Sequence, residues 1–352
     1  MDLDNITEIK EIDKSGMATL LHGFSEQCQQ GIILGQGAEV PFKKGAIKNI
    51  IITGLGGSGI GGDLLRISSV NQLSIPLYIN RGYHLPGFAG EESLVFVVSY
   101  SGNTEETISA LQGAIKAGCQ IVIISSNGLL EKVAQEKSLP LLRIPKGYPP
   151  RTALGYLFFP IRKSIEKLGY IPEQKGAEEE TISLLQDLAR QYSLEQPLSS
   201  NPAKQLAQRL FNKIPVVYGT LDNTDVVAYR WKCQFNENAK AYAAYHVFPE
   251  LNHNEIVGWE RADAIAKQFV VTIFRDKGDP ARIKQRIDIT ARMLSDKVDQ
   301  VIQLDSQGDS LLARIFSLIY LGDYVSYYLA ILREIDPTPV QSINYLKSEL
   351  SK

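Results

Sequence analysis

The sequence is poor in the residues that build disulfide frameworks and metal sites. It has three cysteines and four histidines among 352 residues. The cysteines, Cys28, Cys119 and Cys233, are widely spaced and odd in number. This pattern supports neither a disulfide framework nor a zinc site. We therefore expect no metal, and we expect a reducing compartment, of which the cytoplasm is the simplest.

An excess of charge of one sign and long apolar runs are also lacking. The formal net charge is −2, so no basic bias attracts nucleic acid. The first ten residues mix acids with apolar residues and do not form a secretory signal. Residues 311–332 are apolar but are interrupted by Arg314 and Asp323, which favours a core or dimer-interface helix over a membrane span. We expect neither nucleic acid nor a membrane as a partner.

Short β-branched runs alternate with helical segments along the chain. The expected strands are residues 48–53, 75–80, 94–98 and 120–125 in the first half, and 213–218, 269–274 and 298–304 in the second. The expected helices include one from near residue 60, then 105–117 and 225–236. Strands that alternate with helices imply parallel sheets covered on both faces.

A polar, proline-containing link over residues 192–202 separates the two halves. We predict an α/β fold with two three-layer α/β/α domains, each built on a central, mainly parallel sheet. The first domain, residues 1–190, includes an N-terminal helical segment. The second, residues 191–352, ends in a helical segment and a tail.

The first glycine-rich loop has the spacing G-x-G-x-x-G over residues 54–59. A dinucleotide site also needs an acid at the end of the second strand, where this chain has Asn80. Glycines allow close approach of a ligand, and amides at a helix N-terminus favour anions. Gly56, Gly57 and Ser58 therefore fit a sugar-phosphate cradle. From this loop alone, a nucleotide site and a plain strand-to-helix turn stay open.

The second loop carries three hydroxyls, Ser99, Ser101 and Thr104, directly after a buried strand and before a helix. Together with the amides of the first helical turn, they offer the donors that the oxygens of a phosphate monoester need. The alternative is a helix N-cap at Thr104. A cap needs one hydroxyl, so three of them and a glycine favour a phosphate site.

Candidate acids and bases lie in the second half. His253 stands between two asparagines in an expected loop, and a histidine there can transfer protons near neutral pH. Its alternative role is as a capping or core residue. Glu237, flanked by asparagines and close to Lys240, is either a base or a surface glutamate. On residues alone, Glu250 and Glu255 compete with it as bases.

Several motifs together resemble a known family. The two loops resemble those of sugar isomerase (SIS) domains, which bind phosphosugars there. Asn-Glu-Asn-x-Lys at 236–240, Glu-Leu-Asn-His-Asn-Glu-Ile at 250–256, Pro-Pro-Arg-Thr-Ala-Leu-Gly at 149–155 and the tail over 336–347 extend the resemblance. Together they look like the bifunctional phosphoglucose/phosphomannose isomerases, which are built from two SIS domains.

The resemblance implies roles for four catalytic residues. Glu237 is the expected base, His253 opens the sugar ring from the neighbouring subunit of a homodimer, and Arg151 and Lys347 complete the site. The implied reaction interconverts glucose 6-phosphate and mannose 6-phosphate with fructose 6-phosphate through a cis-enediolate, without a cofactor. Such a reaction belongs to glycolysis and gluconeogenesis. The alternative is a non-catalytic SIS protein that binds a phosphosugar and regulates.

Overall fold

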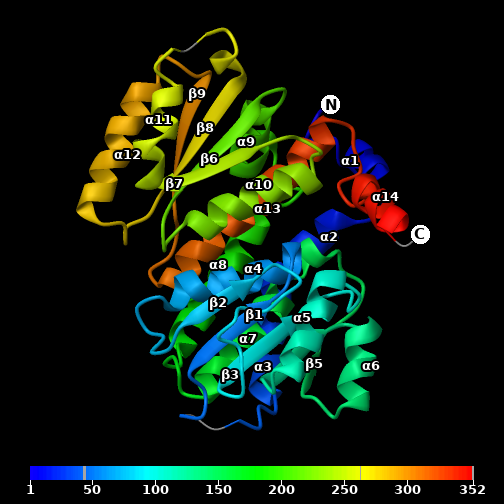
Figure 1. Cartoon of the computed structure of the whole chain (residues 1–352). Helices are drawn as coiled ribbons and strands as arrows, with labels where there is room; N and C mark the ends of the chain where they lie inside the picture. The colour runs from blue at the N-terminus through cyan, green and yellow to red at the C-terminus, as the bar shows by residue number, and fades with distance from the viewer. Residues whose placement is uncertain (43–44, 262, 351–352) are drawn as a thin grey trace. The chain divides into compact units, whose positions relative to one another are not determined.

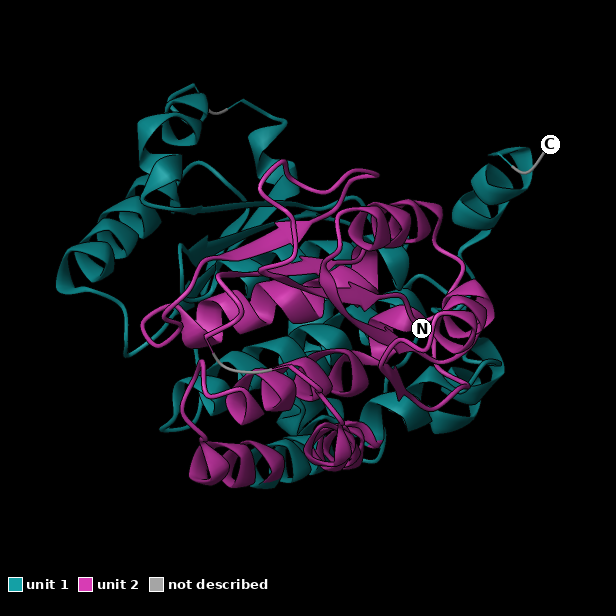
Figure 2. Ribbon diagram, turned by 60° about the horizontal axis from the view of Figure 1, so that its bottom comes forward, with its two compact units in different colours: residues 1–22, 183–352 teal, residues 23–182 magenta. Residues whose placement is uncertain are grey.

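The computed structural model describes residues 1–42, 45–261 and 263–350. These residues form two compact units, one of residues 23–182 and one of residues 1–22 together with 183–352, which Figure 2 colours separately. The expected domain boundary between residues 190 and 191 is a different division from these two compact units, and it stays a prediction.

A five-stranded parallel sheet forms the centre of the unit of residues 23–182 (Figure 1). Its strands are β1 (Asn49–Thr53), β2 (Leu77–Asn80), β3 (Ser93–Val98), β4 (Gln120–Ser125) and β5 (Leu141–Arg143). The strand order is β2-β1-β3-β4-β5, and every neighbouring pair is parallel. All six residues of β3 are buried, as expected for a sheet covered on both faces. The strand order reverses between β1 and β3, and such switch points are where open parallel sheets bind ligands.

Helices cover this sheet on both faces. They are α3 (Phe24–Gly37), α4 (Gly56–Ser69), α5 (Glu105–Lys116), α6 (Gly128–Glu136), α7 (Leu154–Lys167) and the start of α8 (Lys175–Tyr192), with a 3-10 turn η1 (Pro150–Thr152) before α7. One apolar core joins the sheet to α5 through residues such as Val95, Leu111 and Ile123.

The second unit has a four-stranded parallel sheet with the order β7-β6-β8-β9. Its strands are β6 (Ile214–Thr220), β7 (Ala244–Phe248), β8 (Phe269–Arg275) and β9 (Gln300–Asp305). Its helices are α1 (Ile6–Ile12), α2 (Met17–His22), the rest of α8, α9 (Pro202–Leu210), α10 (Asp225–Glu237), α11 (Glu255–Gly258), α12 (Ala281–Leu294), α13 (Leu311–Leu332) and α14 (Gln341–Leu350). Three 3-10 turns complete it: η2 (Leu198–Ser200), η3 (Glu250–His253) and η4 (Ala266–Gln268).

The long helix α13 is the centre of the second unit's core. By length and composition alone it would pass for a membrane span, but its most apolar window is 100% buried inside the protein. Its charged side chains are paired: Asp323 lies 2.7 Å from Arg230, and Arg314 lies 2.8 Å from Asp276. Burial raises the pKa of Asp323, and the neighbouring Arg230 opposes that rise. The burial and pairing confirm a core helix.

The α/β class with two parallel sheets is confirmed, and the structure differs from the prediction in two respects. Helix α4 begins at Gly56 rather than near Ile60. Glycine is a poor helix former, but a Cβ added to Gly61 would lie 2.2 Å from the carbonyl oxygen of Leu157, so the close packing of α4 on α7 needs it. Strands β5 and β7 were not predicted; both are edge strands of mixed burial, with weak hydrophobic periodicity.

Candidate active site

The first loop ends at the N-terminus of α4, on the carboxyl edge of the first sheet. The N-cap residue is Leu55, and no side chain caps this helix within the described residues. Gly56 has φ 51°, a left-handed conformation that favours glycine. The α4 amides and the helix dipole are therefore presented at the switch point, where they favour a bound anion.

Gly57 allows the segment that carries Arg151 to lie against this loop. A Cβ added to Gly57 would lie 2.6 Å from the carbonyl carbon of Pro150 and 2.7 Å from the amide nitrogen of Arg151. The side chain of Arg151 is buried, and only 4% of the residue is exposed. The structure thus brings two predicted site segments, far apart in the sequence, into main-chain contact.

The second loop is joined to the first by a hydrogen bond. The amide of Tyr100 donates to Oγ of Ser58 over 3.0 Å. Oγ of Ser99 lies 2.9 Å from Oγ1 of Thr104, and the amide of Asn103 donates to Ser101 over 3.3 Å. The four predicted hydroxyl residues therefore belong to two connected loops at neighbouring strand ends.

The side chain of Thr104 does not cap helix α5. Thr104 occupies the N-cap position of α5, but its side chain makes no capping hydrogen bond there. The hydroxyl contacts Ser99 instead. At the end of β2, the side-chain amide group of Asn80 donates to the hydroxyl of Thr53 over 3.2 Å and to the carbonyl of Gly82 over 3.1 Å. That position holds a structural amide rather than the acid of a dinucleotide site.

Glu237 lies in the other unit, as the last residue of α10. It lines a cavity of about 520 Å³ together with Asn236, Lys240 and residues of the segment 335–343. Lys347 lies further along, in α14, whose described residues are all exposed, and it does not line this cavity. The tail over 336–347 was predicted to contribute Lys347, but it is the earlier part of this tail that lines the cavity opposite Glu237.

The two competing glutamates hold local structure instead. Glu250 accepts a hydrogen bond from the Asn254 amide group over 2.8 Å. Glu255 accepts one from the hydroxyl of Tyr218, and the indole of Trp259 donates to that hydroxyl over 3.1 Å. Burial and the nearby Glu255 carboxylate raise the pKa of Tyr218 above its usual range. These contacts leave Glu237 as the candidate base that lines a cavity.

His253 is exposed at the end of η3, directly before α11. Figure 1 places α11 and the C-terminal helix α14 at opposite ends of their unit. The cavity of Glu237 includes the first residues of α14. The His253 of a chain is therefore on the α11 side of the unit, whereas the cavity of Glu237 is on the α14 side.

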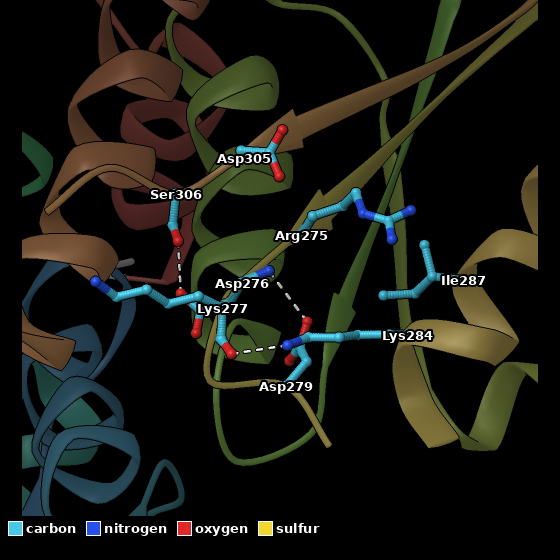
Figure 3. A pocket seen from close by; sticks show the side chains of 8 residues that line it. All are labelled: Arg275, Asp276, Lys277, Asp279, Lys284, Ile287, Asp305 and Ser306. Atoms are coloured by element: carbon cyan, nitrogen blue, oxygen red, sulfur yellow. Dashed lines mark hydrogen bonds between the residues drawn. The ribbon is translucent and has the colours of Figure 1, made fainter. Parts of the chain in front are cut away.

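The carboxyl edge of the second sheet has a different chemistry (Figure 3). Asp276, which follows β8, accepts hydrogen bonds from Ser306 over 2.6 Å and from Arg314 over 2.8 Å. Burial alone would raise the pKa of Asp276, but hydrogen bonds from these partners outweigh it and lower the pKa. Asp279 accepts from the amide of Asp276 over 3.1 Å, and burial raises its pKa. At this edge the main-chain amides of Asp276 and Gly278 donate to carboxylates, whereas the first sheet presents hydroxyls at its strand ends.

No group of three or more His, Cys, Asp or Glu side chains suited to a metal ion occurs among the residues that the structure describes. Cys28, Cys119 and Cys233 are free cysteines.

Comparisons with known proteins agree with the motifs and the fold. The model of the bacterial phospho-glucose isomerase C-terminal SIS domain matches residues 199–350. A bifunctional phosphoglucose/phosphomannose isomerase from Caldicellulosiruptor bescii is 44% identical over 94% of this chain and 98% of its own length. One from Aquifex aeolicus is 38% identical over 87% and 91%.

Among solved structures, a glucose-6-phosphate isomerase like protein from Thermus thermophilus superposes with a TM-score of 0.65. It shares 19% identity and covers 97% of this chain and 98% of that one, which shows a common fold. The matches to these two curated relatives cover 94% and 87% of this chain. The chain belongs to the family of bifunctional phosphoglucose/phosphomannose isomerases.

Proposed function

We propose that this protein interconverts glucose 6-phosphate and mannose 6-phosphate with fructose 6-phosphate through a cis-enediolate. The observation that carries the proposal is the pair of loops at the first switch point. Ser58 is bonded to the second loop, Thr104 contacts Ser99 instead of capping its helix, and Arg151 lies against the first loop. This arrangement offers hydroxyls, helix amides and a cation to a phosphorylated sugar.

In the proposed mechanism, Ser58, Ser99, Ser101 and Thr104 bind the phosphate at the non-reacting end of the sugar, with Gly56 and Gly57 allowing its close approach. Binding energy gained at this remote group orients C1 and C2 for reaction. Helix amides at α4 and α5 add favourable electrostatics for the dianion.

The chemical steps are proton transfers. His253, together with Lys347, moves a proton between the ring oxygen and O1 and so opens the ring. Glu237 then removes the proton from C2 of the aldose and returns it to C1, while the proton of the C2 hydroxyl passes to O1, so that the carbonyl moves from C1 to C2. The guanidinium of Arg151 is always charged and stabilises the negative charge of the enediolate. These residues exchange protons only, so the proposed reaction needs no redox cofactor.

Both sugar substrates reach the same intermediate. Glucose 6-phosphate and mannose 6-phosphate differ only in configuration at C2, and that carbon becomes planar in the enediolate. A base that reaches either face of C2, or a substrate that rotates about its C2–C3 bond, gives both activities.

We further propose that the active form is a homodimer. The placement of His253 and of the Glu237 cavity on opposite sides of the unit supports a histidine supplied by a second copy. We place the enzyme in the cytoplasm, in line with its free cysteines, where it would serve glycolysis and gluconeogenesis. The non-catalytic regulator is disfavoured because the chain retains a glutamate that lines a cavity.

A coupled assay tests the proposal by following fructose 6-phosphate formation from each aldose separately. Glu237→Gln removes the base and keeps the shape, and Glu250→Gln is the matched control because Glu250 is exposed and bonded to Asn254. We expect both substrates to turn over, with activity lost only in Glu237→Gln. If only glucose 6-phosphate is turned over, the proposed activity on mannose 6-phosphate is wrong. Intact phosphosugar binding without turnover would favour the regulator.

A further inference from the structure

Helix α10 ends in a turn that is unusual for its residue type. Lys240, three residues after Glu237, has φ 51°, in the left-handed region. A residue that adopts this conformation just after a helix is commonly glycine, because a Cβ makes the conformation unfavourable. A lysine here therefore needs a compensating interaction, and its side chain supplies one.

The ammonium group of Lys240 donates to carbonyls on both sides of the Glu237 cavity. On its own helix it contacts the carbonyl oxygens of Glu237 over 2.8 Å and Asn238 over 3.3 Å. On the opposite segment it contacts those of Asp336 over 3.3 Å and Pro337 over 2.9 Å. The last carbonyls of a helix lack partners within the helix and favour a cation.

The contacts leave Lys240 little capacity for another role. A lysine has three N–H donors, and here four carbonyl oxygens lie within 3.3 Å. The opposite segment is held further by Asp336, whose carboxylate accepts from the amide of Thr338 over 3.0 Å and from the hydroxyl of Ser15 over 3.1 Å. Lys240 is thus a structural cation that joins two walls.

We propose that Lys240 is a positioning residue for the reaction. By binding the carbonyl of Glu237 and those of residues 336 and 337 at once, it sets the separation between the base and the segment that leads to α14 and Lys347. This inference rests on the proposed function, in which Glu237 is the base. Its structural part, the anchoring of residues 335–343 to the end of α10, stands independently of catalysis.

Three substitutions separate the ammonium from the backbone conformation. Lys240→Met removes the charge and keeps the length, Lys240→Gly removes the charge and relieves the left-handed strain, and Lys240→Arg keeps a cation. Asn212→Gly is the matched control, since Asn212 also has a positive φ, of 59°, in an exposed turn before β6. The readouts are kcat and KM for both aldoses, and hydrogen–deuterium exchange of the amides of residues 338–350.

We expect Lys240→Met and Lys240→Gly to lower kcat about tenfold with KM within about twofold, because small displacements of a base are costly. Exchange of residues 338–350 should rise about tenfold or more in the same variants. Lys240→Arg should have kcat and exchange rates much closer to those of wild type, and Asn212→Gly should change neither kcat nor the exchange of residues 338–350.

Wild-type kcat in a folded Lys240→Gly variant would overturn the positioning role, and unchanged exchange would overturn the anchoring. If the wild-type protein turns over neither aldose, the proposed function and the positioning role fail together, and the exchange measurement still decides the anchoring. Should Lys240→Met fail to fold, Lys240→Gly and Lys240→Arg provide the comparison, because glycine suits the left-handed turn.

Discussion

Replacing Gly57 with alanine tests whether the contact between the first loop and Arg151 matters for catalysis. The added Cβ would lie 2.6 Å from the carbonyl carbon of Pro150, whereas ordinary van der Waals contact begins at 3.4 Å. The two segments must therefore separate by about 0.8 Å, and the three nearest atoms, from Pro150 and Arg151, are all main chain, which cannot rotate away. Overpacking of this kind costs about 1–3 kcal/mol of stability.

The expected effect on rate follows from the same displacement. A misplacement of about 1 Å at a reacting centre can cost about a hundredfold. A shift of about 0.8 Å in the segment of Arg151 should then lower kcat by roughly ten- to a hundredfold. The assay is fructose 6-phosphate formation from glucose 6-phosphate, alongside thermal unfolding to confirm that the variant is folded.

Gly37→Ala is the matched control for this substitution. Gly37 is the last residue of α3, in the same unit, and nothing lies within 4 Å of a Cβ added there. Alanine favours helix over glycine, so this variant should keep full activity with equal or greater stability. A folded Gly57→Ala protein with kcat within about twofold of wild type would refute the reasoning, because the position of Arg151 would then not limit the reaction.

Two further predictions concern the hydroxyl loop and the second sheet. Thr104→Val should raise KM roughly ten- to a hundredfold, since a hydrogen bond to a charged group contributes about 1.5–3 kcal/mol. The control Thr107→Val removes a buried hydroxyl that has no hydrogen-bond partner among the described residues, and it should leave KM unchanged. Equal shifts of KM in both variants would argue against a phosphate site. The Asp276 carboxylate should stabilise the fold above its unfolded pKa of about 4 and lose that effect as pH falls through its lower folded pKa, because hydrogen bonds outweigh the burial that alone would raise it. Denaturant titrations would give the free energy of unfolding of wild type and of Asp276→Asn. The difference between the two should stay constant from about pH 7 to about pH 5 and become smaller below about pH 4. A difference that grows as the pH falls would contradict this.

The central strands and the hydroxyl loop could be predicted from the sequence because their signals are local. β4 occupies the predicted residues 120–125, and α13 the predicted 311–332. The start of α4 could not be predicted, since two of its glycines, Gly57 and Gly61, are explained by contacts with η1 and α7, about a hundred residues away in the chain. Edge strands β5 and β7 gave too little hydrophobic periodicity.

The residues of the candidate site follow the same division. Ser99, Ser101 and Thr104 were selected by local spacing, but the hydrogen bond from the Tyr100 amide to Ser58 depends on strand order. Nothing in the motif at 236–240 indicates that the Lys240 ammonium contacts carbonyls at 336 and 337. Contacts between distant segments are set by the tertiary fold, so a motif identifies a residue without identifying its partner.

The composition of the second unit has a consequence for how the protein is made. Residues 23–182 are contiguous, so their sheet can form as soon as that stretch has left the ribosome. The other unit needs both ends of the chain: the hydroxyl of Tyr320 donates to the carbonyl of Leu21 over 2.8 Å, and that of Tyr327 donates to Asp13 over 3.2 Å. Asp13 and Leu21 are translated long before α13, yet these two contacts form only after α13 has been synthesised.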